Sequence, residues 1–426
     1  MKSFILTVCI ATLWICAINV PLSSAHDIDE KGKEESKNYE KETFLGDWGN
    51  VRSKLRDQGI RFEVEYFGDV FSQVRGGVKR AIGYAGLIDL EMYLDGERLF
   101  GWKGAKFSVY AIDTHGVSFQ KNVGSVHDVS SLVAPDGFKM FEMWYEQSFL
   151  EEEVSLLLGL YDVDREFDYR PTAQLFLSGA FGTGIDLSGS GKNGPSIFPV
   201  TSLGGRLKIL PKPDLYYQLA VVDGVPGDPA KSNGTHIKFK KDDGILAIQE
   251  VGYESVSAGD SINKAAVGGW LYTTPLEDLV RVDAKGELIK HAGTYGIYLF
   301  VDGTFYPENL KPVNAFFRIG IADSKVNEVN FYMDGGVVYE GIFDKRPNDL
   351  IGVGWSLAHL SGGFKERQQQ NQINEADSEI QLEVTYKYEV GPGVSLQSAV
   401  QYLFNPALVK DAQDALSVGL RLAIEM

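Results

Sequence analysis

The stretch FEMWYEQSFLEEEVSLLLGLYD, residues 141–162, decides the fold of this chain. In a β-strand, successive side chains point to opposite faces. One face of the first half then carries Phe141, Met143 and Tyr145, and the other carries Glu142, Trp144 and Glu146. The three glutamates that follow form a polar turn into a second alternating run. The first strand is therefore predicted to have one apolar face and one charged face.

The first 43 residues are predicted to lie outside any folded core. Residues 1–25 have the features of a cleaved signal peptide: Lys2 precedes an apolar run that ends at Val20, and small residues follow. A membrane anchor is disfavoured, because the run is shorter than the ~20 residues that a spanning helix needs. Residues 26–43 are almost wholly polar and are predicted to form a disordered tether.

Composition narrows the class of protein. Cys9 and Cys16 both lie in the predicted signal peptide, so neither a disulfide nor a thiolate metal site is expected in the mature chain. The net charge of −17 disfavours nucleic acid as a partner. No linker divides the chain after residue 44, which favours one large architecture.

A short amphipathic helix is predicted within residues 44–59. In GDWGNVRSKLRDQG, Asp47 is the expected N-cap, Val51 and Leu55 lie one turn apart, and Gly59 ends the helix. If the chain begins in the periplasm, this helix is periplasmic.

Residues 60–426 alternate between apolar and polar side chains in segments of about ten, the length of a tilted membrane-spanning strand. Sixteen such segments are expected, starting near residues 60, 86, 104, 138, 154, 201, 214, 244, 264, 294, 314, 329, 350, 378, 393 and 415. Short and long connections alternate between most of them, as in outer-membrane barrels. The fold class is therefore all-β, a sixteen-stranded antiparallel transmembrane barrel. A soluble β-sandwich is the alternative, but its outer face should be polar.

Ordered blocks from residue 44 to residue 426 resemble the OprB-type carbohydrate-selective porins of Gram-negative outer membranes. They include FLGDWGNVRSKLRDQGI, LFGWKGAKF, MFEMWYEQSF, GLYDVDREF, NGPSIFPVTSLGGRLK and DGGVVYEGIFDKRPND. The resemblance implies passive diffusion of small sugars through a sixteen-stranded barrel. The sequence departs from the family at its last residue, Met426, where an aromatic residue is usual.

In such a barrel we expect the apolar face of residues 141–149 to meet lipid and the opposite face to line the lumen. The same parity brings further charged and aromatic residues to the lumen, and aromatic rings beside hydrogen-bond acceptors suit a pyranose. The predicted lumen residues on strands are Glu65, Asp89, Glu91, Tyr93, Glu142, Trp144 and Glu146. Simple solvation of a wide polar wall is the alternative for each of them.

The segment 163–200 is too long for an ordinary loop and is expected to fold inward and constrict the pore. The candidate constriction residues lie at its start and are Asp162, Asp164, Arg165, Asp168, Tyr169 and Arg170. A calcium loop is disfavoured, because Phe167 occupies the position of the glycine that such a loop needs.

No enzymatic constellation is recognised. GSGKNG at 189–194 is followed by Pro195 instead of a helix, and no histidine pair or GxSxG motif is present. No cofactor and no metal are therefore expected. The expected partners are small neutral sugars, outer-membrane lipid and lipopolysaccharide, and a homo-oligomer is left open. A general, weakly cation-selective pore and a barrel-embedded enzyme or adhesin are the alternative functions.

Overall fold

A computed structural model describes residues 42–117, 122–256, 261–306, 311–372, 376–406 and 413–426. All of these residues belong to one compact unit. The expected signal peptide and nearly all of the expected tether lie outside the described residues.

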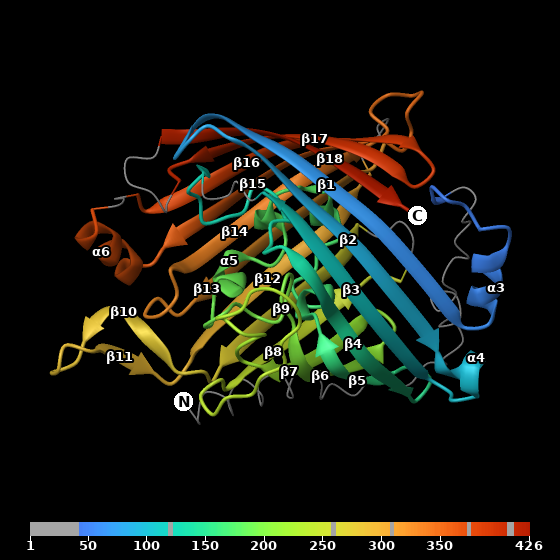
Figure 1. The fold of residues 1–426 in the computed structure, drawn as a ribbon, viewed down its shortest axis with the longest axis horizontal. Helices are drawn as coiled ribbons and strands as arrows, with labels where there is room; N and C mark the ends of the chain where they lie inside the picture. Colours follow the sequence, from blue (N-terminus) through green and yellow to red (C-terminus); the bar gives the residue numbers. More distant parts are fainter. Residues whose placement is uncertain (1–41, 118–121, 257–260, 307–310, 373–375, 407–412) are drawn as a thin grey trace. The chain divides into compact units, whose positions relative to one another are not determined.

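Sixteen antiparallel strands close into a barrel in which β1 pairs with both β2 and β18 (Figure 1). Every other barrel strand also pairs with two neighbours, which confirms the predicted fold class. The barrel strands are β1 Ile60–Gly77, β2 Ile82–Asp95, β3 Ala105–Val117, β4 Gly137–Phe149, β5 Val154–Tyr161, β6 Ser202–Lys212, β7 Leu215–Asp223, β8 Ile245–Glu254, β9 Ile262–Tyr272, β12 Thr294–Phe305, β13 Val313–Ala322, β14 Val329–Glu340, β15 Leu350–Leu360, β16 Ser378–Gly391, β17 Val394–Phe404 and β18 Gln413–Glu425.

Each predicted start agrees with an observed strand to within a few residues. The largest difference is at β2, expected near residue 86 and observed from Ile82. One element was not predicted: the connection between β9 and β12 contains a separate hairpin of β10, Leu276–Val282, and β11, Leu288–His291. It stands outside the barrel ring.

Most connections are short at one end of the barrel and long at the other, although the β1–β2 connection at the long end, residues 78–81, is itself short. Residues 150–153, 213–214 and 392–393 join strands at the short end, where α4, Gly96–Phe100, also lies. The β10–β11 hairpin and α6, Gly362–Gln370, contact each other at the long end (Figure 1). This alternation is the one expected for periplasmic turns opposite extracellular loops.

The N-terminal helix α3 spans Val51–Asp57 and is preceded by Asn50 in a left-handed conformation. Asn50, not Asp47, is therefore its N-cap, which corrects the sequence prediction. The Asp47 carboxylate still stabilises the first turn of the helix, because it accepts hydrogen bonds from the Ser53 amide at 2.8 Å and the Ser53 hydroxyl at 2.7 Å. Gly59, with φ of 92°, ends the helical segment as predicted.

Helix α3 lies against the seam where the first and last strands meet. The Arg52 guanidinium is buried and donates to the carbonyl of Met426 at 2.8 Å and to that of Phe62 at 3.2 Å. The Phe44 amide donates to the Glu425 carbonyl at 2.8 Å. The residues around α3 thereby connect to the end of β18.

The two faces of the wall differ as expected. On the outer face Met143, Val267 and Leu299 are about half exposed, whereas charged residues on the inner face are largely buried. One prediction is wrong: Phe141 does not face outward but is buried inside. The register shifts between Tyr110 and Ala111 of β3, so that β4 contains a bulge at this point and the parity changes.

Candidate functional site

The connection between β5 and β6 folds into the lumen, as predicted. It contains three 3-10 turns, at Val163–Arg165, Thr172–Leu175 and Gly179–Phe181, and the short helix α5 at Ile185–Ser188. We call residues 162–201 the inner loop. Its apolar residues pack into several clusters with the inner wall, one of which places Phe176 and Phe181 against Phe316 of β13.

Carboxylates of the wall accept hydrogen bonds from backbone amides of the inner loop. Glu142 accepts from Asp162 at 2.9 Å, and Glu250 accepts from Asp168 at 2.9 Å. The same arrangement recurs further along the loop, where Asp302 binds Thr172 and Glu383 binds Leu177 and Ser178. A carboxylate that receives backbone amides is a strong, charge-assisted acceptor. These contacts fix the course of the loop across the lumen.

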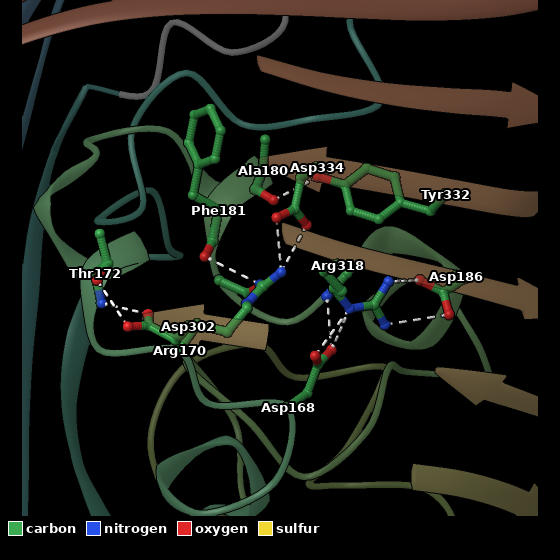
Figure 2. Close-up of polar contacts among 12 residues, drawn as sticks. Asp168, Arg170, Thr172, Ala180, Phe181, Asp186, Asp302, Arg318, Tyr332 and Asp334 are labelled. Carbon is green, nitrogen blue, oxygen red and sulfur yellow. Dashed lines mark hydrogen bonds and ion pairs between the residues drawn. The ribbon is translucent and has the colours of Figure 1, made fainter. Parts of the chain in front are cut away.

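Two buried arginines complete the attachment (Figure 2). Arg170 of the inner loop binds Asp334 of β14 through Nη1, 2.7 Å from each carboxylate oxygen. Arg318 of β13 reaches the other way and binds two loop carboxylates, Asp168 at 2.8 Å and Asp186 at 2.6 Å. All of these charged side chains are essentially inaccessible to solvent. Such ions are tolerated inside a protein only when they are paired and hydrogen-bonded.

The pKa values of two buried carboxyl groups of the inner loop shift in opposite directions. Burial raises the pKa of Asp186, although Arg318 opposes the change. Burial also acts to raise the pKa of Glu166, but Arg206 and Lys208 outweigh it and bring the pKa to about 2. Glu166 therefore remains an anion bound to Arg206, 2.7 Å away.

Arg165, at the start of the inner loop, is the centre of the candidate site. Its Nη2 atom lies 3.0 Å from Oε1 of Glu91 and 2.5 Å from Oε2 of Glu142, and its Nη1 atom donates to the Tyr93 hydroxyl at 2.7 Å. The Arg165 side chain keeps 31% of its surface exposed, whereas Glu142 has none. The partly exposed guanidinium of Arg165 therefore covers the carboxylate of Glu142, which is itself inaccessible to solvent.

Aromatic rings adjoin this cluster. The Arg61 guanidinium stacks on Tyr93, 4.2 Å from the ring centre, and Trp144 meets Tyr93 edge-on at 6.4 Å. The indole Nε1–H of Trp144 is buried and has no hydrogen-bond partner within the described residues. We call Arg61, Glu91, Tyr93, Glu142, Trp144 and Arg165 the Arg165 cluster.

The structure therefore brings five of the predicted site residues into direct contact: Glu91, Tyr93, Glu142, Trp144 and Arg165. Asp162 adjoins them through its amide bond to Glu142. Four others lie elsewhere on the inner surface. Glu146 binds Arg206 at 3.0 Å, and Tyr169 lies beside Lys264, whose Nζ atom is 5.2 Å from the ring centre. Asp89 and Glu65 face each other on β2 and β1.

Glu65 also lines a cavity of about 300 Å³ at the end of the barrel where α3 lies. Phe67, Lys387, Glu389 and Ser395 contribute to the same cavity. It is separate from the Arg165 cluster in its lining residues.

Sequence reasoning missed most wall residues that hold the inner loop, including Arg206, Glu250, Asp302, Arg318, Asp334 and Glu383. A usable signal existed for two of them, because Asp302 in TYGIYLFVDGTF and Arg318 in VNAFFRIGIA are each the one charged residue, at an inward-facing position, of an otherwise uncharged strand. Such residues are costly inside a wall unless they have partners. The partners themselves lie far away in sequence and were not predictable.

Among the described residues, no group of three or more His, Cys, Asp or Glu side chains is placed to hold a metal ion. In the same ranges no helix is long and apolar enough to cross a membrane.

A closed barrel with an apolar outer wall, a polar inner wall and an inward-folded loop defines the class of outer-membrane porins. Within that class, the family model described as "Carbohydrate-selective porin, OprB family" matches residues 79–426. The chain belongs to this family. It is a carbohydrate-selective outer-membrane porin, a channel for sugars and not an enzyme.

Individual relatives agree with this assignment. Porin B of Pseudomonas aeruginosa is 23% identical over 412 residues, which cover 89% of this chain and 90% of that protein. The putative porin QuiX of Acinetobacter baylyi is 23% identical over 421 residues, 90% and 93% of the two chains. Among solved structures, the high-pH structure of Pseudomonas putida OprB superposes with a TM-score of 0.80 at 21% identity, over 91% of this chain and 100% of that one.

Proposed function

We propose that small neutral sugars, monosaccharides or short oligosaccharides, diffuse passively through the lumen past the Arg165 cluster. The observation that carries this proposal is the position of Arg165. Arg165 belongs to the inner loop, its guanidinium is paired with the wall carboxylates of Glu91 and Glu142, and its side chain is still partly exposed. A guanidinium with bound carboxylates offers donors and acceptors to sugar hydroxyls in a fixed geometry.

The aromatic residues of the cluster supply the second half of a sugar site. A pyranose has an apolar face that packs on a ring, while its hydroxyls need polar partners. Tyr93 lies next to Arg61 and Glu91, and the buried Trp144 packs edge-on against the Tyr93 ring, so both requirements are met on one part of the wall.

A general, weakly cation-selective pore remains the second candidate, because acidic residues face one another across β1 and β2. Glu63 is directly opposite Glu91, and Glu65 is directly opposite Asp89. Like charges in directly opposed positions repel, and the lumen field that they create favours cations. In a sugar channel this field gives only a secondary preference.

Sugar block of ion current in planar bilayers tests the proposal. Trp144→Leu and Tyr93→Leu should each weaken the saturable block by glucose or maltodextrin, whereas Trp102→Leu should not, because Trp102 packs against Phe107 and Tyr145 instead. Sugar block that is unchanged in both cluster variants would place the sugar elsewhere.

Ion selectivity tests the second candidate, the weakly cation-selective pore. Glu63→Gln and Glu65→Gln should lower cation preference, measured as a reversal potential in a salt gradient, and leave sugar block nearly unchanged. The difference should shrink toward 1 M salt, where the screening length is about 3 Å. A native channel without any saturable sugar block would favour the general pore.

We further propose that residues 1–25 are removed on export, that residues 26–43 form a periplasmic tether beside helix α3, and that the long connections face the exterior. The alternation of short and long connections and the position of α3 at the short end support this orientation. N-terminal sequencing of the mature protein should begin near His26. Lipid and lipopolysaccharide are the proposed neighbours of the apolar outer wall.

A further inference from the structure

The connection between β7 and β8 contains a run of basic and apolar residues. Residues 231–241, KSNGTHIKFKK, include four lysines and no carboxylate, in a chain whose net charge is −17. Near the end of this run Ile237 and Phe239 alternate with Lys238 and Lys240. We call residues 231–241 the basic segment.

The basic segment lies at the long end of the barrel, beside the start of β4. The Thr235 hydroxyl donates to the Met140 carbonyl at 3.0 Å and accepts from the Met140 amide at 2.7 Å. Lys139 of β4 points inward, because its Nζ atom donates to the carbonyl of Pro199 in the inner loop at 3.2 Å. Phe138 then points to the opposite, outer face, where it is 58% exposed. The basic segment therefore adjoins the rim of the lipid-facing surface.

The apolar side chains of the basic segment do not pack inward. Ile237 is 51% exposed and Phe239 is 69% exposed. At a bilayer interface such side chains can enter the acyl region, while neighbouring lysines extend along them and keep their ammonium groups among the headgroups. An aromatic residue at this level is also typical of outer-membrane barrels. The alternation of apolar and basic residues therefore fits a lipid surface better than bulk water.

Most ammonium groups of the basic segment have no carboxylate partner. Lys238 is paired with the buried carboxylate of Asp228. Lys231, Lys240 and Lys241 are exposed, and none of the three forms an ion pair within the part of the chain that the structure describes. Three cations are therefore available to an external anion at the edge of the wall.

Phosphate on a lipid is the anion that suits this surface. Neutral sugars do not need several cations, and an acidic peptide brings carboxylates but no acyl chains for Ile237 and Phe239. Nucleic acid is disfavoured by the net charge of −17 and by Asp242 and Asp243, which follow the basic segment directly. A phosphorylated lipid satisfies the cations and the apolar side chains together.

We propose that the basic segment binds the phosphate groups of a phosphorylated outer-leaflet lipid, of the lipid A type found in lipopolysaccharide. Lys231, Lys240 and Lys241 bind the phosphates, and Ile237 and Phe239 contact the acyl chains. The inference rests on the proposed orientation, in which the long connections face the exterior, and does not depend on the sugar path.

Lipid binding to the purified barrel in detergent tests the proposal, with bis-phosphorylated lipid A as the probe and native mass spectrometry as the measurement. The test variant leaves the pair of Lys238 and Asp228 intact and combines Lys231→Gln, Lys240→Gln and Lys241→Gln. Its affinity for lipid A should fall by about five-fold for each lysine removed, the usual contribution of a basic residue at an anionic lipid surface.

A matched control removes three exposed cations from the β10–β11 hairpin at the same end of the barrel. It combines Arg281→Gln, Lys285→Gln and Lys290→Gln, and it should bind lipid A like the native protein. In the native protein, lipid A without its phosphates should bind as weakly as intact lipid A binds the test variant. Millimolar inorganic phosphate should not displace intact lipid A, because it makes no contact with the apolar side chains.

Ile237→Ser with Phe239→Ser should weaken lipid A binding several-fold, while the barrel keeps its heat-dependent gel mobility. Equal affinities of the test variant and the hairpin control would overturn the proposal. Equal binding of lipid A with and without its phosphates would do the same, as would displacement by inorganic phosphate, which would indicate a site for small anions only.

Two measurements separate this site from the proposed function and orientation. Sugar block of the ion current should be the same in the test variant and in the native protein, so a failure of the sugar path is recognised independently. Lys231→Cys should react with a membrane-impermeant maleimide on intact cells, since the mature chain is predicted to contain no other cysteine. A thiol that reacts only after the outer membrane is permeabilised would overturn the orientation and the lipid site together.

Discussion

Replacing Arg318 by glutamine should release the inner loop from the wall. Arg318 is fully buried and is the shared partner of Asp168 and Asp186. Its loss leaves two buried aspartates without their counter-ion. Removing one partner of a buried ion pair typically costs about 3–5 kcal/mol.

The same magnitude follows from protonation. An aspartate left without its counter-ion can take up a proton, but at pH 7 that costs about 4 kcal/mol, because an ordinary aspartate pKa of about 3.9 lies some three pH units lower. A cost of 3–5 kcal/mol corresponds to an increase in the population of the detached loop of roughly a hundred-fold to a few thousand-fold. At pH 5 protonation costs only about 1.5 kcal/mol, so the defect should be much smaller there.

Two measurements follow the loop. Single-channel conductance should become larger or noisier in Arg318→Gln at pH 7, and amide hydrogen exchange within residues 162–201 should accelerate by the same factor as the detached population. Both changes should diminish at pH 5. The triple variant Arg318→Met, Asp168→Asn, Asp186→Asn removes all three charges and should restore most of the protection.

Arg367→Gln is the matched control. Its ion pair with Glu328 is about 40% exposed, and exposed pairs contribute at most about 1 kcal/mol. The reasoning is refuted if Arg318→Gln exchanges and conducts like the native protein at pH 7, or if its defect is the same at pH 5.

Three further predictions concern the wall, the loop and the seam. Met143→Arg should reduce barrel stability in bilayers by about 2–4 kcal/mol, the cost of arginine near the membrane midplane, as measured by denaturant titration. The part of the pH response of conductance that depends on Glu166 should appear only as the pH falls from about 4.5 toward 2, because the depressed pKa of Glu166 keeps its link to Arg206 until then. Arg52→Ala should lower the temperature at which the barrel unfolds in detergent, since it removes a charge-assisted bond to Met426 worth about 1.5–3 kcal/mol.

Each of these has a control in the same chain. Met143→Leu keeps an apolar side chain of similar volume and should assemble normally. The acid-induced change in conductance should be smaller in Glu166→Gln than in the native protein. Lys54→Ala alters an exposed residue on the same helix as Arg52 and should leave the unfolding temperature unchanged. Equal behaviour of any variant and its control would contradict the corresponding contact.

Strand number and facing could be predicted because they depend on a local rule. Side chains alternate between faces at every residue, so the parity of Glu91, Tyr93 and Glu146 follows from the sequence alone. The rule failed at Phe141, where a bulge changes the parity without a local sequence signal.

The inner loop shows the other limit of prediction. Its length indicated that it folds inward, and Arg165 was recognised as a candidate for that reason. Its partners were not predictable, because Arg170 and Asp334 are 164 residues apart and meet only after the ring has closed. Glu142 illustrates the consequence: its inward facing was predicted, but its complete burial beneath Arg165 depends on the loop.

The bond between Arg52 and Met426 joins residues 374 positions apart across the seam of the barrel. Helix α3 is synthesised long before β18, yet Arg52 can reach Met426 only when β18 has paired with β1. The position of α3 therefore depends on whether the ring is closed. In an open barrel Arg52 would be solvated and α3 would be detached, whereas in the closed barrel Arg52 is buried and α3 is held in place. Any opening of the seam would release both ends of the folded chain together, at the face where the short turns lie.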